Sequence, residues 1–503
     1  MNQNGLQTVS ARQAALAGAA SALFVLGSWN VWTNGSYALG LNASVFLLLI
    51  LFAFKPPEWS EKLYVRRALP FFLMALSFAL YENPFLKYIS WLVFLPALSL
   101  YYQHEFVSER LRWSALSVAC AWTRAVAAMF SWTVGWSNIK RHLPSLRFLA
   151  DHASLFLRIA KGVCLLLLLS GLVVVPLLAS VDEDFAKAAD AVYQAMSSFF
   201  EWITLTDLAK RTIVFLLLCL TITATIAISA RPAPDLMAHD TQEHDPLSGA
   251  IVLGGLLVLY FAFLGLQAGK LLTSSLPDDF STVEQLVKGG FWQLIVLTAL
   301  NIVLTVSYVR CTQSALRSLL GVFIAASMLL LVSAGWRMAL YVVFYGLSYE
   351  KFFAAYSVLY CAAVLCYLAW QHALQSTGDI VRTLGWLLAW MYAGATVLPV
   401  ESIIFHTNVT LATRTDARLH LDELTMLSPD VLYAVPQTAP FANCRWVSWK
   451  VARSGYVRDK QWYEHTLSSV LNSRHLFSED GGGCLPPVDP AFAEGAYARD
   501  AVR

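Results

Sequence analysis

The sequence predicts an all-α fold: a polytopic transmembrane helix bundle of about eleven spans, with surface amphipathic helices and a small C-terminal extracytoplasmic domain. Composition, apolar runs and the placement of Lys and Arg support this prediction. Hydrophobic residue types make up 57% of the 503 residues and charged types only 14%, whereas soluble domains carry about 25% charged residues. A chain this apolar could not cover its own surface with polar atoms, so the excess must face lipid.

Each span is expected to be a helix, because backbone polar groups in lipid must be hydrogen-bonded within their own segment. Crossing a hydrocarbon core about 30 Å thick takes roughly 20 apolar residues. The runs that meet this requirement lie near 13–33, 37–54, 67–82, 86–103, 162–181, 212–230, 248–269, 290–309, 318–334, 352–370 and 384–403.

The segment Trp113–Trp136 is also apolar, but Arg124 stands at its middle. A central Arg costs roughly 2.5–3.5 kcal/mol on insertion scales. Four tryptophans in the segment are typical of a helix at the membrane–water interface. We therefore expect this segment to lie on the membrane rather than to cross it.

The Lys and Arg residues predict the orientation. With the N-terminus in the cytoplasm, the inner segments hold 17 basic residues and the outer loops hold eight, as the positive-inside rule requires. Eleven crossings then place the C-terminal tail outside. If 113–136 crossed as well, the basic residues between Lys140 and Lys161 would move to the outer side, against this rule.

Four parts follow from this topology: N-terminal transmembrane helices (1–103), a basic cytoplasmic or interfacial segment (104–161), the main transmembrane bundle (162–403) and an extracytoplasmic domain with a loose end (404–503). Between 185 and 203, apolar residues recur every three or four positions, which predicts an amphipathic helix on the outer surface. The last part is polar and proline-containing, unlike the rest of the chain.

The strongest group of candidate functional residues is Arg337, Tyr341, Tyr345 and Glu350. The first three are four residues apart and share one helix face. An Arg near lipid must be paired, and such a residue is by default a functional candidate. One interpretation is an outward-facing site for an anion or lipid headgroup; the favoured one is a structural Arg–Glu pair beside an interfacial aromatic belt.

Gln293 and Asn301 form a second candidate, an intramembrane polar face. They are eight residues apart and therefore lie on about the same side of a helix. They fit either a polar path or, as favoured, interhelical hydrogen bonds. Glu401 and His406, where the last span ends, suit either proton handling or an ordinary interface position, the latter favoured.

No catalytic residue, metal site or cofactor is predicted. The cluster between His239 and Asp245 has ligand types that suit zinc, but a solvated loop is favoured because the spacing matches no metal motif. Cys444 and Cys484 are the only cysteines of the tail. If the tail is in an oxidising compartment, they are candidates for a disulfide; two unpaired thiols are the alternative.

Several motifs, in this order, resemble the DUF4153/DUF4173 group of bacterial multi-spanning membrane proteins of unknown function. They are Ala179–Phe185, Val287–Leu294, Arg337–Tyr341, Tyr345–Ser348 and the run Asn408–Val435, which includes Leu427-Ser428-Pro429-Asp430. The likeness covers roughly 160–440. One departure is Thr413–Asp416, where such proteins often have a longer basic stretch. The resemblance implies a multi-pass architecture and a bacterial source, but no activity. We expect the protein to lie in the inner membrane of a bacterium.

Three classes of function remain. The favoured one is an envelope-associated protein for interaction, assembly or regulation, with the lipid bilayer and an envelope protein, contacted through the C-terminal domain, as partners. The second is a transporter or flippase for a small anion or a lipid-linked substrate. The third is a membrane-embedded enzyme acting on lipid-linked substrates. Nucleic acid is not an expected partner, because the net charge of +2 provides no basic patch.

Overall fold

The computed structural model describes residues 9–56, 59–103, 115–142, 207–230, 246–271, 280–309, 314–375, 380–412, 427–431 and 461–476. Every regular element in these ranges is a helix, as expected for an all-α protein. The chain divides into two compact units. The first contains the N-terminal helices and α12; the second contains the turn at Leu80–Leu86 and the elements after α12.

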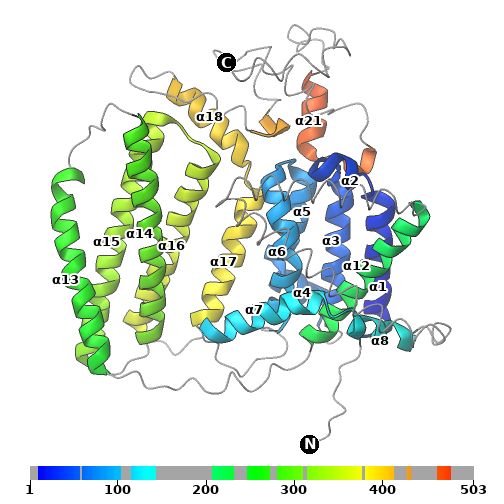
Figure 1. Ribbon diagram of the computed structural model, residues 1–503, viewed down its shortest axis with the longest axis horizontal. Coiled ribbons are helices and arrows are strands. Elements are labelled where there is room, and N and C mark those ends of the chain that lie inside the picture. The colour runs from blue at the N-terminus through cyan, green and yellow to red at the C-terminus, as the bar shows by residue number, and fades with distance from the viewer. Residues whose placement is uncertain are drawn as a thin grey trace, which may run out of the picture. The chain divides into compact units, whose positions relative to one another are not determined.

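The first unit contains α1 (Ala11–Gly27), α2 (Val31–Asn34), η1 (Gly35–Ala38), α3 (Leu41–Phe54), α4 (Glu61–Arg67), α5 (Leu69–Leu80, up to Ala79), α6 (Pro84–Tyr102, from Lys87), α7 (Ala115–Met129), α8 (Trp132–His142) and α12 (Asp207–Ser229). Helix α1 packs against α3 and α12 (Figure 1). It begins at Ser10, which accepts a hydrogen bond from the Gln13 amide in a capping box.

Helices α7 and α8 replace the single interfacial helix expected over 113–136. They contain 15 and 11 residues and are separated near Ser131. Arg124 donates a hydrogen bond to the carbonyl of Ile228 (3.3 Å), and the Trp132 indole donates one to the Thr221 hydroxyl (2.9 Å). Both bonds fasten this pair of helices along α12. Arg124 is half-buried.

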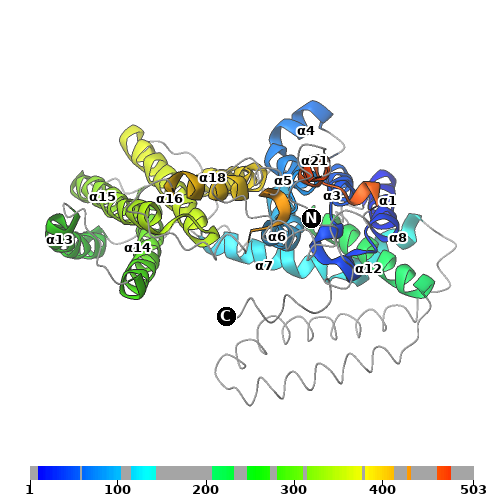
Figure 2. The same cartoon turned by 90° about the horizontal axis from the view of Figure 1, so that it is seen from above.

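The second unit contains α13 (Pro246–Leu271), α14 (Phe280–Tyr308), α15 (Ser314–Tyr345), α16 (Tyr349–Leu374), α17 (Ile380–Val397), α18 (Val400–Ala412), η6 (Pro429–Val431), η8 (Trp462–Glu464) and α21 (Leu467–Leu476). Helices α13 to α16 lie side by side (Figures 1 and 2). Their core is apolar and centres on Leu253, Phe323 and Leu365.

Among the described residues, four helices are long and apolar enough to cross a membrane: α6, α12, α15 and α16. The number rises to six if two bent pairs each count as one span. These are α4 with α5, bent by 77°, and α17 with α18, bent by 66°. Shorter apolar helices occupy Ala11–Gly27, Leu41–Phe54, Gly249–Gly265 and Leu294–Tyr308. The helices support a membrane protein, while the count of eleven stays a prediction.

Several predicted features lie outside the described residues. These are the span at 162–181, the amphipathic helix at 185–203, the His239–Asp245 cluster, and Cys444 and Cys484. Each predicted span within the described residues contains a helix.

Candidate functional site

The turn between α5 and α6 is built by the sequence Glu82-Asn83-Pro84. Pro84 is the first residue of α6, where a fixed φ and a missing N–H are tolerated. The Asn83 side chain accepts a hydrogen bond from the Leu86 amide (3.1 Å), as an N-capping Asn does. The turn therefore presents the start of a 19-residue helix, with Glu82 and Asn83 both buried.

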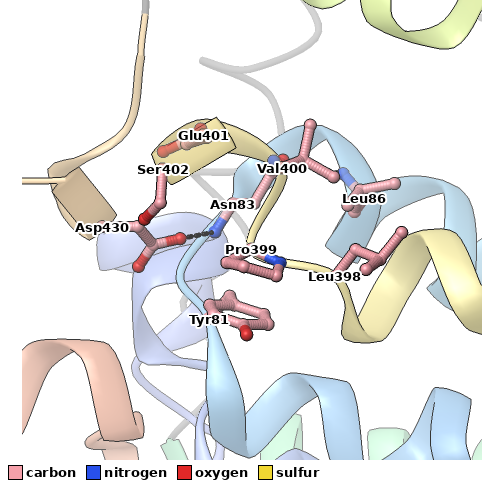
Figure 3. Close-up of a pocket in the computed structure, with 9 residues that line it drawn as sticks. All are labelled: Tyr81, Asn83, Leu86, Leu398, Pro399, Val400, Glu401, Ser402 and Asp430. Atoms are coloured by element: carbon pink, nitrogen blue, oxygen red, sulfur yellow. Dashed lines mark hydrogen bonds between the residues drawn. The ribbon is translucent and has the colours of Figure 1, made fainter. Parts of the chain in front are cut away.

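The Asp430 carboxylate, from η6, lies against this turn (Figure 3). It accepts hydrogen bonds from the Glu82 amide (2.8 and 2.9 Å to its two oxygens) and from the Asn83 amide (3.0 Å). A negative charge is stabilised at this position, because the N-terminus of a helix carries a partial positive charge and unsatisfied amides. Asp430 is buried, so these bonds are largely protected from water.

The tail supplies further hydroxyl groups to the same place. Ser468 donates to the Asp430 carboxylate, and Thr466 donates to Glu82 (3.4 Å). The two hydroxyls also contact each other (3.0 Å). The Asn472 amide donates to the carbonyl of Pro429 (2.7 Å). One side of α21 is thereby held to η6 and to the α5–α6 turn by hydrogen bonds.

Glu401 joins the group from the first turn of α18. Helices α17 and α18 are interrupted at Pro399, which has no N–H and clashes with the preceding helical turn. Ser428 donates a hydrogen bond to the Glu401 carboxylate and accepts one from the Asp430 amide (3.2 Å). We call Glu82, Asn83, Glu401, Ser428, Asp430, Thr466 and Ser468 the Asp430 cluster.

The turn between α15 and α16 is tied to the cluster by two side chains. Asn408 of α18 accepts from the Leu347 amide (2.7 Å) and donates to the Leu347 carbonyl (2.8 Å). Leu347 follows Gly346, whose φ of 79° ends α15 in a conformation that glycine adopts without strain. The side-chain amide of Asn83 (Nδ2) donates to the Tyr349 hydroxyl (3.0 Å).

A small pocket, with a cavity of about 10 Å³, lies beside the cluster. It is lined by Tyr81, Asn83, Leu86, Leu398, Pro399, Val400, Glu401, Ser402 and Asp430 (Figure 3). Ligand pockets for drug-sized molecules measure about 300–1,000 Å³, whereas this cavity is about the size needed for one water molecule. The described residues contain no group of His, Cys, Asp or Glu able to hold a metal ion. The carboxylates here accept hydrogen bonds from amides and hydroxyls, which suits a structural fastening.

Helix α21 buries polar side chains and exposes apolar ones, an arrangement that we call inverted polarity. Its inner side is polar, with Ser468, Ser469 and Asn472 buried. Two apolar side chains among those described lie on the other side: Leu467 is 54% exposed and Leu471 is 42% exposed. Nearby Trp462 in η8 is 75% exposed. Leu467 and Leu471 are four residues apart and are neighbours on the helix surface. An ordinary surface helix has the opposite arrangement.

The structure places the first predicted group on α15 and at the start of α16. Tyr341 and Tyr345 are buried, with ring centroids 5.3 Å apart, whereas Arg337 is half-buried and Glu350 is exposed. The pairing of Arg337 with Glu350 stays a prediction.

A cation that the sequence interpretation missed lies on these two tyrosines. The Lys351 ammonium is 4.6 Å from the centre of the Tyr341 ring and donates to the Tyr345 carbonyl (3.4 Å). Lys351 lies in the first turn of α16, where its backbone amide donates to the Ser348 side chain that caps the helix.

The second predicted group is represented by Asn301, which is buried and accepts a hydrogen bond from the Tyr260 hydroxyl of α13. This bond links α13 to α14. Gln293 lies in α14, but its side chain is outside the described residues. His406 is exposed, while Glu401 is buried in the Asp430 cluster.

Sequence reasoning missed Glu82, Asp430, Thr466 and Ser468. Only Asp430 carried a signal, because it ends the Leu427-Ser428-Pro429-Asp430 motif. The structure brings this motif close to the Tyr345–Ser348 motif through Asn408, Asn83 and Tyr349.

Residues 68–437 match the model of a family described as a domain of unknown function, DUF4153. Comparisons with curated proteins and with solved structures find no match. The matched region includes Asn83, Glu401 and Asp430 and ends before Thr466 and Ser468. Because this region covers more than half of the sequence, the chain belongs to the DUF4153 family, whose activity is not known.

Proposed function

We propose that this protein is a membrane-embedded interaction protein that holds its C-terminal segments in place to bind a second protein of the cell envelope. The observation that carries the proposal is the inverted polarity of α21. The polar side of the helix is buried and hydrogen-bonded to Asp430 and Pro429, whereas Trp462, Leu467 and Leu471 are exposed.

Holding α21 by its polar side has an energetic consequence. Ser, Thr and Asn side chains bury little apolar surface, so these contacts gain little from the hydrophobic effect. Exposed apolar groups that gain nothing in the monomer are stabilised when a partner covers them. Trp is enriched among residues that dominate binding energy, especially when apolar neighbours surround it.

The proposal includes the topology derived from the sequence: eleven spans in a bacterial inner membrane, a cytoplasmic N-terminus and a periplasmic C-terminus. The tail would then face the periplasm, where envelope proteins are accessible to it. The distribution of Lys and Arg supports this orientation.

Site-specific photo-cross-linking in native membranes tests the proposal. A benzophenone amino acid is introduced in place of Trp462 or Leu471, in otherwise intact full-length protein. Both positions are expected to cross-link to a protein of the same mass. A matched control carries the same group at Val258 of α13, which is 70% exposed on an apolar helix and should label lipid only.

The cross-link should weaken when the remaining apolar residues of the face are made polar, as in Leu467→Ser. Labelling of lipid alone from Trp462 and Leu471, or a product unaffected by Leu467→Ser, would contradict a protein partner. Co-purification from native membranes then identifies the partner with wild-type protein and fails with the variant.

A transporter or flippase for a small anion or a lipid-linked substrate is the second candidate. The supporting observation is the interruption of α17 and α18 beside a pocket, since broken helices commonly form the binding sites of transporters. Asp430 and Glu401 already place negative charge near the starts of α6 and α18, which disfavours an anion there. Proteoliposomes assayed for uptake of labelled sulfate and for movement of fluorescent phospholipid would test this candidate.

A further inference from the structure

A line of polar residues runs along the buried side of α14. Thr298, Asn301 and Thr305 are each at most 2% exposed. Their spacing of three and four residues places them on one face of the helix. The face packs into an apolar core containing Leu257, Phe323 and Leu330. Polar groups in such surroundings need hydrogen-bond partners, because water from bulk solvent does not reach them.

Some hydroxyl groups in this region are satisfied by their own helix. Thr298 donates to the carbonyl of Leu294 (2.7 Å), and Ser327 of α15 donates to the carbonyl of Phe323 (2.8 Å). The Thr305 hydroxyl makes no hydrogen bond to any described residue, although it is fully buried.

Asn301 is in a similar position. Its Oδ1 accepts from Tyr260, but within the described part of the chain its Nδ2 has no acceptor. Within the described residues, two buried polar groups one turn apart on the same face thus have no hydrogen-bond partner. The Asn301 amide donates, and the Thr305 hydroxyl both donates and accepts.

We propose that an ordered water molecule binds between Asn301 and Thr305 and hydrogen-bonds to both. Residues four apart on a helix have Cβ atoms about 5–6 Å apart, a gap that two hydrogen bonds of about 2.8–3.0 Å each can span. A buried water typically satisfies polar groups of this kind.

Thermal unfolding of the full-length protein in detergent, followed by tryptophan fluorescence, tests the proposal. Thr305→Val keeps the side-chain shape and removes the hydroxyl. If water is bound, this change removes one of its two hydrogen bonds to the protein, and the Tm should fall by about 2 °C or more. Thr305→Ser, which keeps the hydroxyl, should lose less. An unchanged or higher Tm for Thr305→Val would overturn the proposal, since it would mean that an unsatisfied group had been removed.

A double-mutant cycle isolates the water from other effects. Thr305→Val and Asn301→Leu should together lower the Tm by less than the sum of the single shifts, because either change alone disrupts the water. The control cycle pairs Thr305→Val with Thr298→Val, whose hydroxyl is satisfied by Leu294, and should be additive. Additive shifts in the first cycle contradict the proposal. A Tm raised by sodium chloride relative to choline chloride also contradicts it, in favour of a bound cation.

Discussion

The carboxylate of Asp430 accepts hydrogen bonds from the backbone amides of Glu82 and Asn83, 348 and 347 residues earlier in the chain. The contact joins the start of α6 to a short 3-10 helix near the C-terminal end of the family match. The entropic cost of closing a loop grows only slowly with its length, so the long separation in sequence adds little to it. Charge-assisted hydrogen bonds to a helix N-terminus are strong enough to offset such a cost.

Asp430→Asn is expected to lower the free energy of unfolding by about 1–3 kcal/mol, the usual range for hydrogen bonds to a buried charged group. The amide has one acceptor oxygen in place of two and carries no charge at the helix N-terminus. Denaturant titration in detergent measures the change. The tail should also become more sensitive to limited proteolysis, because Ser468 loses its carboxylate acceptor.

Asp207→Asn is the matched control for this substitution. Asp207 also lies in the first turn of a helix, but its side chain is 80% exposed and its contact with Lys210 is at the surface. Such pairs contribute about 0–1 kcal/mol. Equal effects of the two substitutions would contradict the role assigned to Asp430.

Gly135→Ala is expected to destabilise the packing of α8 on α12. A Cβ atom at Gly135 would lie 2.4 Å from the carbonyl oxygen of Leu220, a backbone atom that cannot move alone. Overpacking of this kind costs about 1–3 kcal/mol. The apparent Tm of the purified protein should fall accordingly.

Gly18→Ala in α1 is the control for the Gly135 prediction. Nothing lies within 4 Å of a Cβ at Gly18, and Ala is favoured over Gly inside a helix by about 0.5–1 kcal/mol. The Tm should therefore stay the same or rise. A fall in both variants would indicate that the close approach at Gly135 is not the cause.

The contact between Lys351 and the Tyr341 ring should appear as a coupling energy. In a double-mutant cycle of Lys351→Met and Tyr341→Leu, we expect about 0.5–2 kcal/mol of coupling, the range for cation–π pairs. Tyr341→Phe keeps the aromatic ring and should retain most of it. In the control cycle, Glu350→Gln, a change at an exposed neighbour, takes the place of Lys351→Met, and the coupling should be weaker. Equal coupling in both cycles would refute the contact.

Apolar runs predicted the helices well, because each run satisfies its own backbone locally. Their ends were predicted less well. The run at 318–334 belongs to α15, which continues to Tyr345, since polar or aromatic residues after an apolar run do not stop a helix. The Pro399 kink was predictable, because proline acts on its own helix.

The Asp430 cluster could not be predicted in the same way. Its partners come from the α5–α6 turn, the start of α18, η6 and the start of α21, and no local pattern relates them. The inverted polarity of α21 was also hidden. Which side of α21 is buried depends on the hydrogen bonds from Ser468 to Asp430 and from Asn472 to Pro429. The sequence around Leu467 alone does not reveal it.

The proposed topology makes a prediction about both sides of the membrane. Alkaline phosphatase fused after Arg503 should be active, because the enzyme folds only outside the cytoplasm, and a fluorescent protein fused there should be dark. The same reporters placed after His142 test whether α7 and α8 stay on the cytoplasmic side, and should give the opposite pattern. Phosphatase activity after His142, or none after Arg503, would contradict the orientation and the eleven-span count.

A disulfide between Cys444 and Cys484 is the last prediction. Both residues lie outside the described part of the chain, so the prediction rests on the sequence and the proposed topology. A periplasmic tail is in an oxidising compartment, where disulfides persist, and a small domain gains from a covalent link. Closing a loop of about 40 residues should stabilise the tail by roughly 3–4 kcal/mol in the chain-entropy model.

Mass spectrometry after denaturing alkylation tests the disulfide. Without reductant, Cys444 and Cys484 should stay unlabelled and appear as one linked peptide, and with reductant both should be labelled. Cys219 and Cys361 are the internal controls: they are free and buried, so denaturation alone should expose them to the reagent. Labelling of Cys444 and Cys484 without reductant would mean two unpaired thiols, and it would also weaken the placement of the tail outside the cytoplasm.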